Sequence, residues 1–204
     1  MATVVEFWFE FASTYSYPAA FAVEESARAR GVQVAWRPFL LAPIFAAQGW
    51  TDSPFNIYPA KGKYMWRDLA RICARQGLPL RRPTQFPRNG LLAARVACRY
   101  AEESWLPEFV RRVYADNFGD DRDISSAQVV EHIIDSLGLK ANEILAEAQL
   151  QSSKDALRSQ ADRAIKLGLI GAPSFVVDGE AFWGGDRMEA AFDWALGKRD
   201  VVHL

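Results

Sequence analysis

Segments with the pattern of β-strands lie only near the two ends of this chain of 204 residues, and a long helical region separates them. Residues 4–11 form a dense apolar and aromatic run, interrupted only by Glu6 and Glu10, which predicts a buried strand. A helical stretch follows as far as Gly31, and residues 32–39 have the pattern of a second strand. Because a strand–helix–strand unit normally joins parallel strands, we expect these two strands to pair in parallel.

The middle of the chain, from residue 61 to about residue 167, has apolar residues at helical spacing. Clusters of glycine, proline and aspartate divide it into five or six expected helices. Ser125 and Gln128 have the spacing of a capping box, so one of these helices is predicted to begin there.

Near the C-terminus the pattern returns to β structure. Ser174–Val177 and Glu180–Trp183 flank Asp178-Gly179, a pair of residues typical of the type I′ turn of a hairpin. A final helix ending at Gly197 is predicted after two glycines, with Asp186 as its N-cap.

The resulting order is βαβ, then many helices, then ββα. This is the order of a thioredoxin-like fold of the α/β class with a large all-helical insertion. We expect one thioredoxin-like domain formed by residues 1–58 and 168–204, with the helical insertion at about residues 59–167.

Composition excludes several classes of protein. Cys73 and Cys98 are the only cysteines, which rules out a disulfide scaffold and a four-cysteine zinc site, and core packing is their expected role. A net charge of −1 argues against a surface built for nucleic acid. His132 and His203 are far apart, so no metal site is expected. The start lacks the basic region of a signal peptide, and no apolar run approaches the roughly 20 residues of a membrane span, so a cytoplasmic protein is expected.

The junction between the first strand and the first helix is the leading candidate site. A helix start offers unpaired N–H groups and a positive dipole end, and thioredoxin-type proteins place Cys-x-x-Cys there, where these forces lower the thiol pKa. This chain has Ser13-Thr14-Tyr15-Ser16 instead. The structural alternative is that Ser13 only caps the helix.

Two segments near the C-terminus are further candidates. Ala172-Pro173 stands directly before a predicted strand, where thioredoxin-like proteins have a cis-proline that faces the active helix; the alternative is an ordinary trans proline. Trp183-Gly184-Gly185-Asp186 precedes the last helix, where glycines permit close approach of a backbone and a helix start favours an anion. The alternative there is a hairpin exit with a helix cap.

A basic stripe follows Pro59. Lys63, Arg67, Arg71 and Arg75 recur every four residues, and a solvated helix face is the favoured interpretation. Lys61, just before the stripe, is better placed to reach into a cleft.

Four segments together resemble one family: residues 7–16, 59–64, 171–173 and 183–188. They resemble the 2-hydroxychromene-2-carboxylate isomerases and the kappa-class glutathione transferases, which are serine-bearing relatives of the DsbA-type disulfide oxidoreductases. Thr14 stands where many relatives have proline, Glu10 where aspartate is usual, and Asp52 near the place where kappa-class transferases have asparagine.

The resemblance implies a glutathione-dependent enzyme in which the thiol comes from the tripeptide. Ser13 would stabilise the thiolate as the catalytic residue, and Ala172 before Pro173 would pair with the glutathione backbone. Gly184, Gly185 and Asp186 after Trp183 would hold the γ-glutamyl end, and Lys61 would line the cleft.

The resemblance implies conversion of 2-hydroxychromene-2-carboxylate, or a similar aromatic 2-oxo acid precursor, to a trans-benzylidenepyruvate in the breakdown of aromatic compounds. Addition of the thiolate, rotation and elimination would give the product. Two alternatives stay open: a kappa-like transferase that conjugates glutathione to electrophiles, and a non-catalytic thioredoxin-fold protein that binds peptides. Relatives are commonly dimers, so a homodimer is expected.

Overall fold

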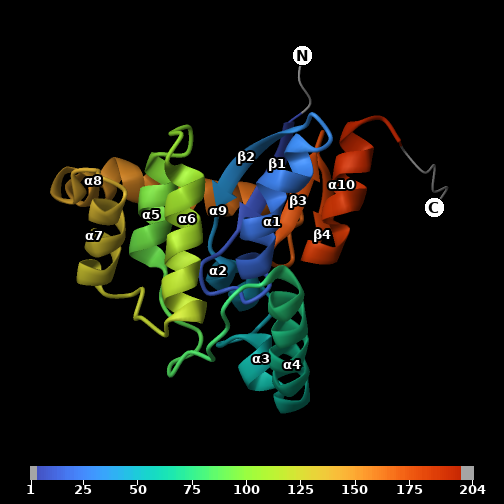
Figure 1. Cartoon of the computed structure of the whole chain (residues 1–204), viewed down its shortest axis with the longest axis horizontal. Coiled ribbons are helices and arrows are strands. Elements are labelled where there is room, and N and C mark those ends of the chain that lie inside the picture. The colour runs from blue at the N-terminus through green and yellow to red at the C-terminus, as the bar shows by residue number, and fades with distance from the viewer. Residues whose placement is uncertain (1–3, 199–204) are drawn as a thin grey trace.

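The computed structural model describes residues 4–198, and at its centre is a mixed four-stranded sheet (Figure 1). The strands are β1 (Val4–Phe9), β2 (Gln33–Pro38), β3 (Ser174–Val177) and β4 (Glu180–Trp183), in the spatial order β2-β1-β3-β4. β1 and β2 are parallel as predicted, and β3 is antiparallel to both β1 and β4. The two ends of the chain therefore build one sheet.

Both faces of the sheet are covered by helices. Phe7 and Phe9 of β1 point into the larger core, with α1 (Ser16–Arg28) and α10 (Met188–Ala195) on that side. Trp8, between them, points to the opposite face, where α2 (Leu41–Ala47) and α9 (Gln151–Lys166) pack. All three aromatic side chains are fully buried, so the apolar residues of β1 serve the cores on both faces of the sheet.

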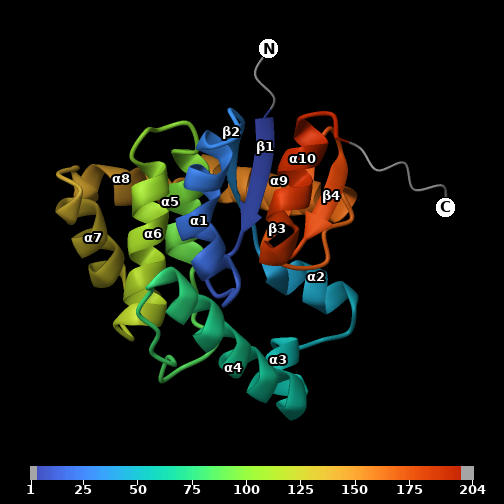
Figure 2. The ribbon, with the colours of Figure 1, turned by 45° about the vertical axis from the view of Figure 1, so that its right-hand side comes forward.

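The other helices lie in two groups. α5 (Leu91–Arg99), α6 (Leu106–Tyr114) with its π-helical extension (Ala115–Gly119), α7 (Ala127–Ser136) and α8 (Ala141–Ala148) gather on one side of the sheet. α3 (Pro54–Ile57) and α4 (Pro59–Gln76) lie with α2 beyond the end to which β1 runs (Figure 2). The division into a domain of residues 1–58 and 168–204 and an insertion of 59–167 stays a prediction.

Several predicted boundaries were wrong by one or two residues or in their capping. The two N-terminal strands are shorter than residues 4–11 and 32–39: a turn closed by the Ser13 N–H and the Glu10 carbonyl follows β1, and β2 ends at Pro38, just before α2. Ser125 does not cap α7: its hydroxyl donates to Asp123, and Ser126 precedes the helix. Asp186 lies in a short 3₁₀ turn (Gly185–Arg187), and α10 begins only at Met188.

Residues 40–58, between β2 and α4, contain two short helices that were not predicted. α2 accommodates Pro43 in its first turn, where no helical N–H is lost. α3 starts with Pro54, and the Ser53 hydroxyl accepts the N–H of Phe55 at 3.3 Å. These helix starts hold the segment over the end of the sheet.

The hairpin turn is confirmed in detail. Asp178 and Gly179 both have positive φ, at 53° and 87°, as a type I′ turn requires. Within residues 4–198, no helix is long and apolar enough to cross a membrane.

Candidate active site

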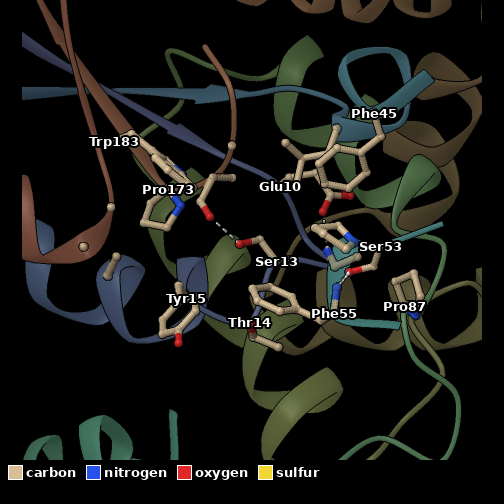
Figure 3. A pocket seen from close by; sticks show the side chains of 18 of the residues that line it. Glu10, Ser13, Thr14, Tyr15, Phe45, Ser53, Phe55, Pro87, Pro173 and Trp183 are labelled. Atoms are coloured by element: carbon tan, nitrogen blue, oxygen red, sulfur yellow. Dashed lines mark hydrogen bonds between the residues drawn. The ribbon is translucent and has the colours of Figure 1, made fainter. Parts of the chain in front are cut away.

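A cleft of about 1840 Å³ opens at the start of α1, between the sheet end and helices α2, α3 and α4 (Figure 3). Loops at residues 86–91 and 170–173 and the turn before α10 complete its walls. The residues that the sequence singled out all line it: Ser13, Lys61, Ala172, Pro173, Trp183, Gly184, Gly185 and Asp186. Segments more than 150 positions apart in the chain thus meet at one place.

Ser13 lies three residues before α1 rather than at its N-cap, which is Tyr15. Its hydroxyl donates to the carbonyl of Ala172 at 2.8 Å and accepts the N–H of Ser16 at 3.4 Å. The turn before the helix therefore presents Ser13 to the cleft while the hydroxyl still satisfies one N–H of the helix start. The hydrogen bond to Ala172 joins the two ends of the chain.

The wall opposite Ser13 is built by close backbone contacts. The Ala172–Pro173 bond is cis, and the N–H of Gly184 donates to the Pro173 carbonyl at 2.9 Å. A Cβ at Gly171 would lie 2.4 Å from Nε1 of Trp183, so only glycine permits the indole to lie there. Gly184 has a φ of 110°, a conformation that side chains rarely adopt.

The charged residues predicted for the site lie at its rim. The Lys61 ammonium stands 4.7 Å from the ring centroid of Tyr58 and is exposed. Asp186 is also exposed, and its carboxylate pairs with Arg187 at 3.3 Å. A Cβ at Gly185 would meet Ala19 and Pro173 only at ordinary contact distances of 3.9 and 4.0 Å, so the backbone there is open to a ligand.

Glu10 is a cleft residue that the sequence did not assign to the site. Burial raises the pKa of its carboxyl to about 7, even though backbone N–H groups of Ala12 and Ser13 stabilise the charge. Its Oε2 accepts from Ala12 at 2.9 Å. Its place three residues before Ser13, at the end of a buried strand, was the only signal in the sequence.

The part of the cleft beside Glu10 is aromatic. Phe45 of α2 contacts Trp50, and Phe55 of α3 lies edge-on to Tyr15, with ring centroids 6.2 Å apart. Figure 3 shows Glu10 and Phe45 on one side of Ser13, and Pro173 and Trp183 on the other. The cleft therefore has two halves: an aromatic half around Glu10, and a backbone-lined half around Pro173.

Tyr15 and Asp68 form a polar contact across the cleft. The Tyr15 hydroxyl donates to Oδ2 of Asp68, on α4, at 3.2 Å. Burial and the nearby carboxylate raise the pKa of Tyr15, so its hydroxyl stays protonated and serves as a donor. This pair connects the start of α1 to α4.

Arg88 anchors the loop that leads to α5. It is buried, forms an ion pair with Asp121, and donates to the carbonyls of Asn117 and Arg122. Its charge is thereby compensated within the protein, and its structural role gave no pattern that the sequence could reveal.

Neither cysteine lines the cleft. Cys73 is fully buried on the core face of α4, and burial raises the pKa of its thiol to about 11. Burial also raises the pKa of the Cys98 thiol, which packs against the same core. Both cysteines therefore pack in or against the core, as predicted. Within the described range, residues 4–198, no cluster of three His, Cys, Asp or Glu could hold a metal; His203 lies outside that range.

Comparison with known proteins decides the family. The family model described as the DsbA-like thioredoxin domain matches residues 4–193, nearly the whole chain. The chain belongs to the DsbA-like thioredoxin-domain family. This confirms the α/β thioredoxin-like fold predicted from the order of strands and helices.

Within this family, the similarity also extends to the relatives that the sequence resembled. The chain is 27% identical to a 2-hydroxychromene-2-carboxylate isomerase of Sphingobium xenophagum, over 93% of this chain and 96% of the relative. It is 26% identical to glutathione S-transferase kappa 2 of Caenorhabditis elegans, over 94% and 91% of the two chains. A solved structure of a 2-hydroxychromene-2-carboxylate isomerase superposes with a TM-score of 0.84 at 22% identity, covering 96% of this chain and 95% of the other. The resemblance stated from the motifs is confirmed.

Proposed function

We propose that this protein is a glutathione-dependent isomerase that converts 2-hydroxychromene-2-carboxylate, or a similar aromatic 2-oxo acid precursor, to the trans-benzylidenepyruvate. One observation carries the proposal. The cleft places a serine hydroxyl at the helix start where redox relatives use cysteine, and it contains no thiol of its own. The names of the similar proteins support both glutathione and this reaction class.

The residues of the backbone-lined half fit a γ-glutamyl tripeptide. Ala172 offers a backbone carbonyl beside Pro173, the natural partner for a peptide N–H. The open backbone at Gly185, at the start of the turn before α10, suits a carboxylate, and Trp183 supplies an exposed apolar wall. The N–H of Gly184 is already used by the Pro173 carbonyl, so Gly184 contributes by shaping the turn. Lys61 at the rim provides a cation for an anionic ligand.

Glutathione, when bound, would supply a thiolate that adds reversibly to a conjugated double bond, which can rotate while it is single. Ser13 would make this thiolate available at neutral pH, although a free thiol has a pKa near 8.5. Its hydroxyl donates to the Ala172 carbonyl in this structure. A peptide N–H that bonds to Ala172 would compete for that carbonyl and leave the hydroxyl proton of Ser13 to a sulfur. The helix start adds positive potential at the same place.

The test follows the ultraviolet spectrum of 2-hydroxychromene-2-carboxylate with and without glutathione. Turnover that depends on glutathione is expected for the wild type, and kcat should fall about 100-fold or more in Ser13→Ala, the size typical of a lost transition-state donor. Ser16→Ala is the matched control, since Ser16 is buried and lies outside the cleft lining. Absence of turnover in the wild type, or full activity of Ser13→Ala, would overturn the proposal.

A kappa-like glutathione transferase is the second candidate. It is favoured by the acidic character of the aromatic half, where Glu10 and Asp52 line the cleft and Arg88 is already paired with Asp121. The buried Arg88 is not available to a substrate carboxylate, which would depend on the exposed Lys61 or Arg75 of α4, whereas an uncharged electrophile needs no cation. A conjugate that accumulates from chlorodinitrobenzene, without isomerisation, would favour this activity.

A non-catalytic peptide-binding protein is the third possibility that the sequence left open. Calorimetry with glutathione at millimolar concentration would support it if no binding were detected. The cytoplasmic location, the homodimer and a role in the breakdown of aromatic compounds stay predictions. Gel filtration with light scattering tests the dimer directly.

A further inference from the structure

Glu10 lies in the aromatic half of the cleft beside Ser13, and among the described contacts its carboxyl group has no cation as a hydrogen-bond partner. It follows directly after β1, whose buried residues fix its position, and the N–H of Ser13 donates to its backbone carbonyl at 3.0 Å. The serine and the carboxyl are therefore held by one turn of the chain.

The contacts of Glu10 leave part of the carboxyl open to a ligand. Oε2 accepts the N–H of Ala12, and the side chain lines the cleft beside Phe45 (Figure 3). Glu10 thus faces the half of the cleft in which an aromatic molecule would bind, while Ser13 faces the half suited to a peptide.

We propose that Glu10 is the proton carrier of the reaction, donating a proton to the carbonyl oxygen of the aromatic acceptor and taking it back when the carbonyl re-forms. This deepens the proposed function and rests on it. The acceptor is the ring-opened cis keto acid, which forms when the hemiketal O–H proton moves to the ring oxygen and the C–O bond of the ring breaks. As sulfur bonds to the far carbon of its conjugated system, the electron pair of the double bond shifts toward the carbonyl oxygen. The O–H bond of Glu10 breaks, its electron pair stays on the carboxylate, and a new O–H bond forms on the acceptor. Elimination runs the same steps backwards, so no oxidant or reductant is needed.

The protonation state of Glu10 suits this role. Burial raises the pKa of its carboxyl to about 7, so both forms are populated near neutral pH, which is the optimum for a general acid and base. The ionisable groups around it are otherwise engaged. Tyr114 of α6 donates to the Glu10 carbonyl, Asp52 before α3 accepts from Ser53 and Asn56, and Arg88 before α5 is paired with Asp121.

The kinetic test uses Glu10→Gln, which keeps the shape but carries no transferable proton. Wild-type kcat/KM for the acceptor should fall above about pH 7 as Glu10 ionises, and this limb should be absent in the variant. The variant should lose about 100-fold in kcat at neutral pH. Glu10→Asp should recover part of the activity together with the limb. Asp52→Asn removes another carboxylate from the same cleft and should keep the limb.

A direct titration does not depend on turnover. Carbon-13 NMR of protein labelled at the glutamate carboxyls should show one signal that titrates near pH 7, absent in Glu10→Gln. No such signal, or wild-type kcat in Glu10→Gln, would overturn the role of Glu10 alone. A wild type that turns over no acceptor with glutathione would overturn the proposed function, and the role of Glu10 would fall with it.

Discussion

At the scale of single residues, burial of Glu10 has a cost for stability that depends on pH. The pKa of its carboxyl is raised from 4.5 in the unfolded chain to about 7 in the folded protein, so the folded state binds more protons between these values. Stability must then fall as pH rises from about 4.5 to 7, and the loss stays complete above 7. A shift of this size corresponds to about 3 kcal/mol at most.

Glu10→Gln removes that ionisation and should stabilise the protein at pH 8 by up to about 3 kcal/mol, with little change at pH 4.5. Urea unfolding of both proteins at the two pH values measures this difference. If Glu10→Gln gains stability at pH 8 but loses activity, the carboxyl serves the reaction rather than the stability of the fold. If Glu10→Gln and the wild type were equally stable at both pH values, the pKa of Glu10 would not be raised by folding.

Gly171 is the residue that permits the Trp183 wall. In Gly171→Ala the new Cβ would lie 2.4 Å from the indole Nε1, and Trp183 is more than half exposed, so the ring should swing away. We expect less than about 1 kcal/mol of lost stability, since a flexible side chain relieves the clash, but about tenfold weaker glutathione binding.

Calorimetry with glutathione measures the effect. Gly119→Ala is the matched control, because its Cβ meets only ordinary contacts at 3.6 Å or more and Gly119 does not line the cleft. Unchanged affinity in Gly171→Ala would mean that the indole contributes nothing to the ligand site.

At the scale of elements, Gly62 fixes how α3 sits on α4. A Cβ there would lie 2.2 Å from the backbone carbonyl oxygen of Phe55, and a backbone cannot swing aside. Gly62→Ala should therefore displace α3 and Phe55 from the aromatic half. We expect KM for the aromatic acceptor to rise about tenfold and stability to fall by about 1–3 kcal/mol, although alanine normally favours a helix.

Kinetics with the acceptor varied at saturating glutathione, together with thermal unfolding, checks this prediction. Because α3 does not contribute to the Pro173 half and reaches the glutathione site only through Tyr58 and Lys61, glutathione affinity should change less than KM for the acceptor. A variant that is more stable than wild type with the same KM would show that α3 adjusts freely.

The elements show which parts of the fold a single sequence can predict. The pairing of β1 and β2 and the hairpin at Asp178-Gly179 depend on local patterns, periodicity and turn chemistry, and were predicted correctly. Helices α2 and α3 were missed, because each is short and stabilised by contacts with the end of the sheet and with α4 rather than by its own propensity.

The candidate site divides in the same way. Ser13 and Ala172-Pro173 were identified by their positions relative to predicted elements. The fold brings the Ser13 hydroxyl within 2.8 Å of the Ala172 carbonyl oxygen. The raised pKa of Glu10 arises from burial by segments distant in sequence, so no local pattern could reveal it. The ion pair of Arg88 with Asp121 also joins residues that are distant in the sequence, so no local pattern could reveal it.

At the scale of the whole molecule, the separation of both cysteines from the cleft predicts an enzyme whose chemistry survives without any protein thiol. Cys73 and Cys98 pack against the main core, and the pKa of each thiol is raised by burial, which makes both poor nucleophiles. The double variant Cys73→Ala, Cys98→Ala should lose about 1–3 kcal/mol of stability through the cavities that it creates.

Its glutathione-dependent kcat should nevertheless stay within about twofold of wild type under conditions where both proteins are folded, because no described contact connects either thiol to Ser13. A dithiol oxidoreductase would instead lose all activity with its cysteines. Activity and urea unfolding of the same double variant separate the two cases. Loss of turnover in a folded, cysteine-free protein would require a thiol of the protein in the reaction, and the borrowed-thiol chemistry assigned to Ser13 would then be wrong.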